Sequence, residues 1–441
     1  MQGQEKTLED IFKTGVKAVD PERAVHKYVR RQGNQLFVGD CSYILDSYKR
    51  IFLIGAGKGT APMAKALEDI LGERLTNGLI IVKYGHGIPL EKTQILEADH
   101  PIPDDAGLRA TEELLRQAQE CTNKDLIICA FSGGGSALLP APSSPITLDQ
   151  KQVTTHLLLD CGATINEINA IRKHLSRSKG GWLAKKAYPA TIVSLLLSDV
   201  IGDRLDVIAS GPTVPDESTY SDCIKVIDRY KLIDRLPKSV AEYFEKGAAG
   251  HLPETPKTGD PVFSHVQNLI VGNNRESLLA AKERAISLGY NTIILSSQIE
   301  GEAREVAQVF AAIGKEISKA NLPISPPACV IAGGETTVTI HGGGKGGRSQ
   351  ELALACAVVI DGWEGIFLLS AGTDGTDGPT DAAGAIVDGT TCKRARQTNL
   401  DPREFLFAND SYAFFESLGD LLKTGPTRTN VMDIICMLVD T

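Results

Sequence analysis

A chain of 441 residues is too long for one ordinary hydrophobic core, so the sequence predicts two domains or three. Its formal net charge of −9 argues against a general nucleic-acid binder, because affinity for a phosphate backbone needs an excess of lysine and arginine. No apolar run approaches the roughly 20 residues that cross a bilayer, and nine cysteines without a CxxC pair fit reduced thiols, so we expect a soluble cytoplasmic protein without membrane partners.

The first fifty residues are predicted to be helical, because Thr7 and Asp10 give a capping pattern ahead of an apolar period. Residues 50–71, RIFLIGAGKGTAPMAKALEDIL, then have the pattern of a strand, a glycine turn and a helix. The same order recurs at 125–139, DLIICAFSGGGSALL, and residues 190–203, ATIVSLLLSDVIGD, add a further apolar strand. Apolar strands that alternate with helices predict a parallel sheet covered on both faces.

A change in composition at residues 245–263, which are rich in glycine, proline, lysine and threonine, predicts a linker or a long surface loop. We place the domain boundary there, with an N-terminal domain at 1–245 and a C-terminal domain at 246–441. The α/β alternation resumes with the strand NLIVGNN at 268–274. The alternation TVTIH at 337–341, between glycines, predicts a hairpin.

The turn GAGKGT at residues 55–60 resembles a dinucleotide-binding fingerprint but departs from it twice. Thr60 stands where the third glycine is needed, and the next strand ends in Lys83 instead of the acid that binds a ribose. It is not a Walker A loop either, since no serine or threonine follows the GK pair. Two interpretations remain: an anion site formed by backbone N–H groups with Lys58 beside them, or tight packing of the helix on the sheet.

The second loop, residues 132–136 in FSGGGSALL, contains more glycine than a tight turn requires. It could form a nest of N–H donors for a carboxylate or a phosphate. The alternatives are a plain turn and a nucleophilic serine, although GGGSA lacks the GxSxG pattern and no histidine marks a triad. The candidate binding residues are Ser132, Gly133, Gly134, Gly135 and Ser136.

A third glycine cluster, HGGGKGGRSQE at 341–351, precedes the predicted helix RSQELALACAVV. The guanidinium fork of Arg348 suits phosphate oxygens and can stabilise the charge that spreads over a phosphoryl group during transfer. The alternative is a mobile surface loop. The other candidate residues in this region are Gly343, Gly344, Lys345 and, at the end of the preceding strand, Glu335.

Several aspartates follow predicted strands, at the sheet edge where open α/β sheets bind ligands. Asp199 follows SLLL and is a candidate to orient a substrate hydroxyl. Asp374 and Asp377 share the loop TDGTDGPTD and are candidate metal ligands, because magnesium needs only one or two carboxylates besides phosphate oxygens. Asp-Gly is also a common turn dipeptide, which is the alternative for both.

Together these features are the parts that phosphoryl transfer requires: groups that position phosphates and neutralise charge, with little covalent chemistry from the protein. No zinc-binding or haem-binding pattern occurs, and His86 and His100 lie near loop ends without a metal-ligand spacing. The residues alone therefore predict a kinase-like or phosphate-binding enzyme of unknown substrate.

Long motifs throughout the chain resemble those of class II glycerate kinases, the glycerate 2-kinases with a C-terminal MOFRL domain. The resemblance covers nearly the whole chain, in order, and rests on the motifs IGAGKGTAPMA, FSGGGSALL, INAIRKHLSRSKGG, LSDVIGD, ASGPTVPD, GGETTVTIHGGGKGGRSQELAL, AGTDGTDGPTDAAGA and TGPTRTNVMDI. It implies two α/β domains, the first Rossmann-like with a mostly parallel sheet and the second with a mixed sheet, and an active site in the cleft between them. It also implies transfer of the ATP γ-phosphate to the 2-hydroxyl of D-glycerate, with Mg²⁺ or another divalent cation, giving 2-phosphoglycerate and ADP.

By this resemblance the family's active-site lysine is Lys58 and its active-site arginine is Arg348. The sequence departs from the family pattern at Ser349, where the family's GGRNQE has asparagine. That the product is the 2-phosphate rests on the resemblance alone, and the sequence leaves open whether the chain is a homodimer. Two alternatives remain: an NAD(P)H-dependent hydroxypyruvate reductase, a label that members of this family have carried, and a non-catalytic nucleotide-binding module.

Overall fold

The computed structural model describes residues 2–440, which form two compact units. The N unit contains residues 21–198 and 203–271, and the C unit contains residues 2–20, 199–202 and 272–440. This division differs from the predicted boundary at 245/246. The chain does run as a loop after α10 (Lys238–Ala248), but it then adds β9 (Val266–Gly272) to the first sheet, so the N unit continues to residue 271.

The N unit is built on a six-stranded sheet of order β6-β5-β4-β7-β8-β9, and its pairings from β6 to β8 are all parallel, as predicted. Its other strands are β4 (Arg50–Ala56), β5 (Asn77–Lys83), β6 (Thr93–Ala98), β7 (Asp125–Phe131) and β8 (Thr191–Leu197). This is the strand order of Rossmann-type sheets, in which ligands bind at the carboxyl ends of the strands where the order reverses. Here that point lies between β4 and β7.

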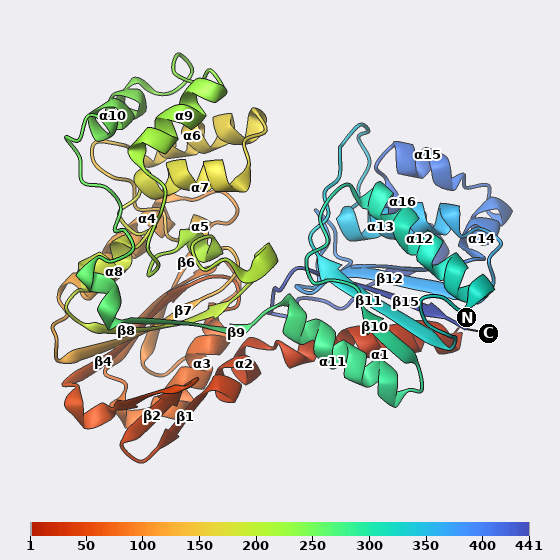
Figure 1. The fold of residues 1–441 in the computed structure, drawn as a ribbon, viewed down its shortest axis with the longest axis horizontal. Coiled ribbons are helices and arrows are strands. Elements are labelled where there is room, and N and C mark those ends of the chain that lie inside the picture. Colours follow the sequence, from red (N-terminus) through yellow and green to blue (C-terminus); the bar gives the residue numbers. More distant parts are fainter. Residues whose placement is uncertain (1, 441) are drawn as a thin grey trace. The chain divides into compact units, whose positions relative to one another are not determined.

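Helices cover both faces of this sheet. α3 (Thr60–Leu71) lies on one face, and α4 (Asp105–Gln119) and α8 (Trp182–Ala187) lie on the other (Figure 1). Leu114 of α4 and Leu183 of α8 pack there with Ile127 and Ile192. The short α5 (Gly135–Leu138) follows β7. A separate helical bundle encloses its own core around Phe244; its helices are α6 (Leu148–Asp160), α7 (Ile165–His174), α9 (Tyr220–Arg229) and α10.

The prediction that the first fifty residues are helical holds only through α1 (Gln2–Ala18) and α2 (Pro21–Tyr28). An antiparallel sheet follows, formed by β1 (Val29–Gln32), β2 (Gln35–Val38) and β3 (Cys41–Ile44). Gly33 and Gly39, with φ of 57° and 56°, make its two turns in the left-handed region that glycine adopts without strain. The predicted cap at Thr7 is wrong, because Thr7 lies inside α1 and its hydroxyl donates to Gly3 O.

The C unit has a mixed sheet of order β10-β11-β15-β12-β13-β14, as predicted. β10 and β11 pair in parallel, and the other pairings are antiparallel. The strands are β10 (Asn291–Ile294), β11 (Ala328–Gly334), β12 (Ile366–Gly372), β13 (Gly384–Asp388), β14 (Leu421–Leu422) and β15 (Asp433–Val439). The predicted hairpin at 337–341 is wrong. The segment runs as a loop in which Thr337 forms one isolated bridge with Glu302, and the N–H of His341 donates to Asn409 Oδ1, far along the chain.

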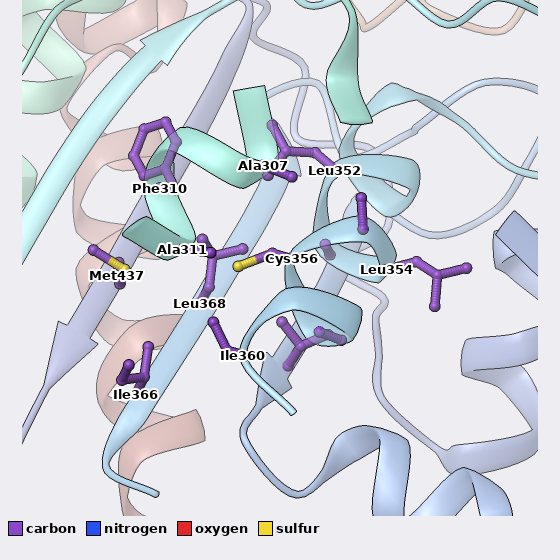
Figure 2. Packing of buried hydrophobic residues seen from close by; sticks show 14 of the residues in the cluster. Ala307, Phe310, Ala311, Leu352, Leu354, Cys356, Ile360, Ile366, Leu368 and Met437 are labelled. Atoms are coloured by element: carbon purple, nitrogen blue, oxygen red, sulfur yellow. The ribbon is translucent and has the colours of Figure 1, made fainter. Parts of the chain in front are cut away.

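Two helical layers enclose the mixed sheet. α1 lies beside α11 (Asn274–Ser287) on one face, where Phe12 and Leu278 pack with Leu369, and this packing places α1 in the C unit (Figure 1). α12 (Ala303–Ala320) and α13 (Arg348–Val359) cover the other face, and Figure 2 shows Phe310 and Leu352 in that core. The smaller helices are α14 (Thr391–Gln397), α15 (Pro402–Phe407) and α16 (Ser411–Leu418). Among the helices formed by residues 2–440, none combines the length and the apolar character needed to cross a membrane.

Candidate active site

Two glycine turns meet at the reversal point of the N-unit sheet. The turn 57–59 follows β4, the loop 132–136 follows β7, and the two strands are paired. The backbone N–H of Lys58 donates to Gly133 O at 2.8 Å, and the N–H of Gly59 donates to Ser132 Oγ at 2.9 Å. Loops that the sequence identified separately are therefore one structural element.

The glycines of the first turn are required for this close approach. A Cβ on Gly57, whose φ is 144°, would overlap Ser132 Oγ. A Cβ on Gly55 would overlap Ala130 O of the neighbouring strand. The packing interpretation of GAGKGT therefore holds at these two positions, and it does not depend on the side chain of Lys58.

The side chains of Lys58 and His100 lie beside the loop 132–136. A Cβ on Gly134 would lie 3.5 Å from Lys58 Cγ and 2.9 Å from His100 Cδ2, so both side chains stand beside the loop. Among residues 2–440, the N–H groups of Gly133 and Gly134 have no hydrogen-bond acceptor. A lysine with two such N–H groups is suited to bind a carboxylate or a phosphate.

The environment of His100 keeps its imidazole neutral. Burial and the positive charges of Lys58 and Lys83 lower the pKa of His100 from 6.5 to about 4. The ring can therefore form hydrogen bonds to a bound anion at neutral pH without adding charge. The sequence analysis assigned His100 no role, because only the fold brings it beside Lys58.

We expect the His100 imidazole to stay neutral over the whole range from about pH 5 to 8. Its pKa is lower in the folded protein than in the unfolded chain, so its contribution to stability is present above about pH 6.5 and is lost as the pH falls through about 4. Proton NMR of the imidazole resonances tests this, with H100N identifying the signal. A His100 midpoint near 6.5 would contradict a buried ring flanked by cations.

Other hydroxyl groups engage the serines of the loop. Ser136 Oγ lies 2.7 Å from Ser210 Oγ, and Ser210 Oγ donates to Asn169 Oδ1 at 3.2 Å. Ser132 Oγ lies 3.2 Å from Thr60 Oγ1. In the described part of the chain neither loop serine hydrogen-bonds a histidine, so a nucleophilic serine has no structural support.

In the C unit, Arg348 is held by two carboxylates. It is the first residue of α13, and its Nε and Nη2 groups donate to Asp433 at 2.6 and 3.0 Å in a bidentate pair. Its Nη1 group donates to Glu335 Oε1 at 2.6 Å. These contacts use three of the five guanidinium N–H groups, which leaves two for a phosphate oxygen.

Asp433, which pairs with Arg348, is a candidate residue that was not predicted from the sequence. It begins the apolar strand β15 and pairs with Gly334 on one neighbouring strand and Gly372 on the other, so it lies at the middle of the sheet edge. Burial acts to lower the pKa of Arg348, but the charges of Asp433 and Glu335 outweigh it and raise that pKa. Burial also raises the pKa of Glu335. The arginine stays charged within a surplus of carboxylates.

Asp377 caps helix α13. Its Oδ1 accepts the N–H of Ser349 at 3.1 Å, and its Oδ2 accepts the N–H of Gln350 at 2.8 Å. Asp377 is 4% exposed, and burial together with the charge of Asp433 raises its pKa to about 7. Both carboxylate oxygens are committed to the helix terminus, which argues against the predicted role of Asp377 as a metal ligand.

The third glycine cluster, residues 341–347, is anchored to the turn that precedes α16. Asn409 and Asp410 accept three of its N–H groups at 2.8, 3.0 and 2.9 Å, and the donors are His341, Gly342 and Lys345. The N–H of Gly344 donates to Ala408 O at 3.0 Å. These four N–H groups have partners within the C unit, so the cluster is neither a mobile loop nor an open nest of donors.

Two glycines of this cluster should respond differently to alanine. A Cβ on Gly347 would overlap the carboxyl group of Asp377, whereas a Cβ on Gly343 would have no heavy atom within 4 Å. We expect G347A to lower the free energy of unfolding by about 1–3 kcal/mol and G343A to change it by less than about 0.5 kcal/mol. Thermal unfolding of the two variants measures the difference in Tm. Equal Tm values would contradict the packing described.

The two remaining predicted acids lie just beyond strand ends. Asp199 is half-buried and follows β8 by two residues. Asp374 follows β12 by two residues, and its Oδ1 accepts the N–H and the hydroxyl of Thr376, each at 3.0 Å. Among residues 2–440, one group brings three possible metal-ligand atoms within 4.8 Å of one another, and it is the exposed set Glu22, His26 and Asp69 of the N unit.

Glycine turns that meet beside a lysine at the reversal point of a Rossmann-type sheet are typical of enzymes that bind phosphates or carboxylates. A family model described as a domain of unknown function (DUF4147) matches residues 7–245, and the MOFRL family model matches residues 328–433. D-glycerate 2-kinase from Thermotoga maritima is 42% identical over 98% of this chain and 97% of its own. Glycerate 2-kinase from Pyrococcus horikoshii is 40% identical over 96% and 94%.

A crystal structure of glycerate kinase from Thermotoga maritima is similar over 100% of both chains, with a TM-score of 0.87 and 40% identity. The chain belongs to the glycerate 2-kinase family, with a DUF4147 region followed by a MOFRL domain. The resemblance identified from the motifs is confirmed.

Proposed function

We propose that the protein transfers the γ-phosphate of ATP to the 2-hydroxyl of D-glycerate. The hydroxyl oxygen forms a bond to the γ-phosphorus, the bond from that phosphorus to the bridging oxygen of ADP breaks, and the hydroxyl proton is released. The products are 2-phosphoglycerate and ADP. The observation that carries this proposal is the identity of 42% and 40%, over nearly the whole chain, to two proteins named as 2-kinases of glycerate.

The loops that follow β4, β7 and β8 supply groups that bind the acceptor. Lys58 and the N–H groups of Gly133 and Gly134 attract the incoming phosphoryl group at the hydroxyl end of the acceptor. Asp199 accepts a hydrogen bond from the 2-hydroxyl and orients it. A strong base is not required, because phosphoryl transfer passes through a loose transition state.

Arg348 contacts the phosphates of ATP through the two N–H groups that its carboxylate partners leave. Asp433 and Glu335 hold the guanidinium in a fixed orientation, which makes Glu335 a positioning residue in this proposal. Lys345 is a weaker candidate for phosphate binding than the sequence indicated, because its Nζ lies 4.4 Å from the ring centroid of Tyr412 in a cation–π contact.

The acidic residues of the C unit fit a divalent cation such as Mg²⁺. Arg348 pairs with the carboxylates of Glu335 and Asp433, and the charge of Asp374 acts on Glu335, so negative charge is in surplus. Mg²⁺ takes one or two carboxylate oxygens from a protein and completes its shell with phosphate oxygens and water, so three converging ligands are not needed. Asp374 is the proposed ligand. When bound, Mg²⁺ neutralises charge on the β- and γ-phosphates of ATP.

The identity of the product tests the proposal. The protein is incubated with ATP, Mg²⁺ and D-glycerate, and enolase is added without phosphoglycerate mutase. We expect phosphoenolpyruvate to form, because enolase accepts the 2-phosphate. Consumption of ATP without phosphoenolpyruvate would contradict transfer to the 2-hydroxyl of glycerate, and no consumption of ATP would contradict the kinase.

A hydroxypyruvate reductase is the second candidate, because the strand order of the N unit is also that of dinucleotide-binding sheets. Its residues are less favourable to a dinucleotide: β5 ends in Lys83 rather than an acid, and Thr60 replaces the third glycine. Oxidation of NADH or NADPH in the presence of hydroxypyruvate measures this activity directly. We expect none.

A further inference from the structure

Three basic residues of the N unit have no carboxylate partner among residues 2–440. Lys151 of α6 is 6% exposed, and its Nζ has no hydrogen-bond partner among residues 2–440. Lys179 is fully buried, and its Nζ donates to one carbonyl oxygen, that of Leu139, at 2.9 Å. Arg172 of α7 is half-buried and forms neither an ion pair nor a hydrogen bond within the described chain.

Neighbouring cations are neutralised, so these three are exceptions. Lys173 is 3% exposed, and its Nζ lies 3.2 Å from a carboxylate oxygen of Asp206 and 3.2 Å from one of Asp216. Arg177 Nη2 lies 2.9 Å from Glu112 Oε1. Burying a charge without a partner costs several kcal/mol, and proteins keep such groups mainly where a ligand or a reaction uses them.

The three cations lie near enough to repel one another. Burial and the charges of Arg172 and Arg177 lower the pKa of Lys151 from 10.5 to about 7. Burial and the charges of Lys151 and Arg172 lower the pKa of Lys179 well below its ordinary value. A small anion among these groups would relieve both effects, because it supplies the opposite charge that the protein does not.

Lys179 of this cluster is hydrogen-bonded to the segment that follows the loop 132–136. Leu139, whose carbonyl accepts from Lys179, directly follows α5, and α5 begins inside the loop. Asn169 lies one helical turn before Arg172 on α7 and is linked to Ser136 of the loop through a single serine hydroxyl. Lys179 and the helix that carries Arg172 are therefore both connected to the loop segment by hydrogen bonds.

We propose that Lys151, Arg172 and Lys179 form the subsite for the carboxylate of the hydroxy-acid acceptor. This inference rests on the proposed function, in which the acceptor is a small molecule with one carboxylate. A deeply buried cation cluster suits such an anion better than nucleotide phosphates, which are larger and carry a divalent cation that these lysines repel. Arg172 supplies a planar fork that matches a carboxylate, and the lysines supply charge. Lys58 then serves the hydroxyl end and the phosphoryl group.

Equilibrium binding tests the role of Arg172. Titration calorimetry with D-glycerate and with ATP compares the wild type with R172Q and with R177Q, the control whose arginine already pairs with Glu112. We expect R172Q to weaken binding of D-glycerate about 10- to 100-fold through loss of charge-assisted hydrogen bonds, with ATP affinity within about twofold of wild type. R177Q should not weaken the binding of either ligand, because loss of the Arg177 charge raises the pKa of Lys151 and so favours its charged form. Unchanged glycerate affinity in R172Q, or an equal loss for both ligands, would overturn the subsite.

Titration with inorganic phosphate shows whether the cluster binds a phosphoryl group or the carboxylate of D-glycerate. If phosphate binding depends on Arg172 and glycerate binding does not, the cluster receives a phosphoryl group and the carboxylate assignment is overturned. The reverse pattern supports it.

The Tm measured without ligand distinguishes a ligand-binding role of Lys151 from a structural role. K151M removes a buried charge that has no partner, so we expect Tm to stay the same or rise while glycerate binding weakens. K173M leaves Asp206 and Asp216 without their cation, so its Tm should fall by several degrees. A fall for K151M as large as that for K173M would overturn the ligand-binding role of Lys151.

The failures of the two proposals are distinguishable. A wild-type protein that forms phosphoenolpyruvate in the enolase assay while R172Q binds D-glycerate equally well would keep the reaction and overturn the subsite. A wild-type protein that forms no phosphoenolpyruvate but binds D-glycerate in an Arg172-dependent manner would overturn the reaction and support the subsite.

Discussion

Replacing Lys58 with methionine should lower kcat for phosphorylation of D-glycerate about 100- to 1,000-fold and leave Tm within about 2 °C of wild type. The turn keeps its structure, because the N–H of Lys58 still donates to Gly133 O and the flanking glycines are unchanged. The lysine side chain is half-buried beside Gly134 and His100, and methionine preserves its apolar stem while removing the charge. Steady-state kinetics and thermal unfolding of K58M measure the two effects.

K65M is the matched control for K58M. Lys65 lies on α3, the helix that directly follows the same turn, and its Nζ is 2.6 Å from Asp69 Oδ1 in an exposed pair that contributes little to stability. Its activity and Tm should stay near those of wild type. Loss of the Lys58 charge should also raise the pKa of His100, which NMR detects independently of turnover. Near-normal turnover of K58M would remove Lys58 from the catalytic group.

The sheets were predictable because their central strands are continuous apolar runs that end in glycine turns. The apolar run and the glycine loop within DLIICAFSGGGSALL were enough to predict β7 and the turn after it. β1, with the sequence VRRQ, carries no period that distinguishes a strand from a helix, and the turns at Gly33 and Gly39 were not predicted. β9 follows a linker-like segment, so its sequence did not indicate that it joins the first sheet. Which sheet a strand joins is decided by pairing with distant strands, not by its own sequence.

The same limit applies to the candidate site. Lys58, Arg348 and the loop 132–136 stand in local patterns that suit anion binding, so the sequence alone made them candidates. Asp433 begins an ordinary apolar strand, and only its pairing with two neighbours brings it to Arg348. Asp377 illustrates the converse, since an Asp-Gly pair fits a metal ligand, a turn or a helix cap equally well until the fold places it at the start of α13.

Replacing Arg348 with lysine should lower kcat about 100-fold or more while preserving most of the stability. Lysine keeps a positive charge against Glu335 and Asp433 but has no planar fork, so it can neither hold Asp433 through two bonds nor present oriented N–H groups to a phosphate. R348A should lose activity and also lower Tm by a few degrees, because breaking a partly exposed ion pair costs about 1–3 kcal/mol. Kinetics and thermal unfolding of both variants measure this.

R304K is the control for R348K, because it also replaces an arginine of the C unit with lysine but leaves Arg348 in place. Arg304 Nε lies 2.6 Å from Glu351 Oε1, and its Nη2 group donates to Leu406 O. R304K should lower Tm about as much as R348K does while leaving kcat within about threefold of wild type. If R348K retained kcat as well, the charge alone would suffice, and the fork would serve to position Asp433. If both variants lost kcat equally, the loss would reflect packing of the C unit, and Arg348 would no longer belong to the catalytic group.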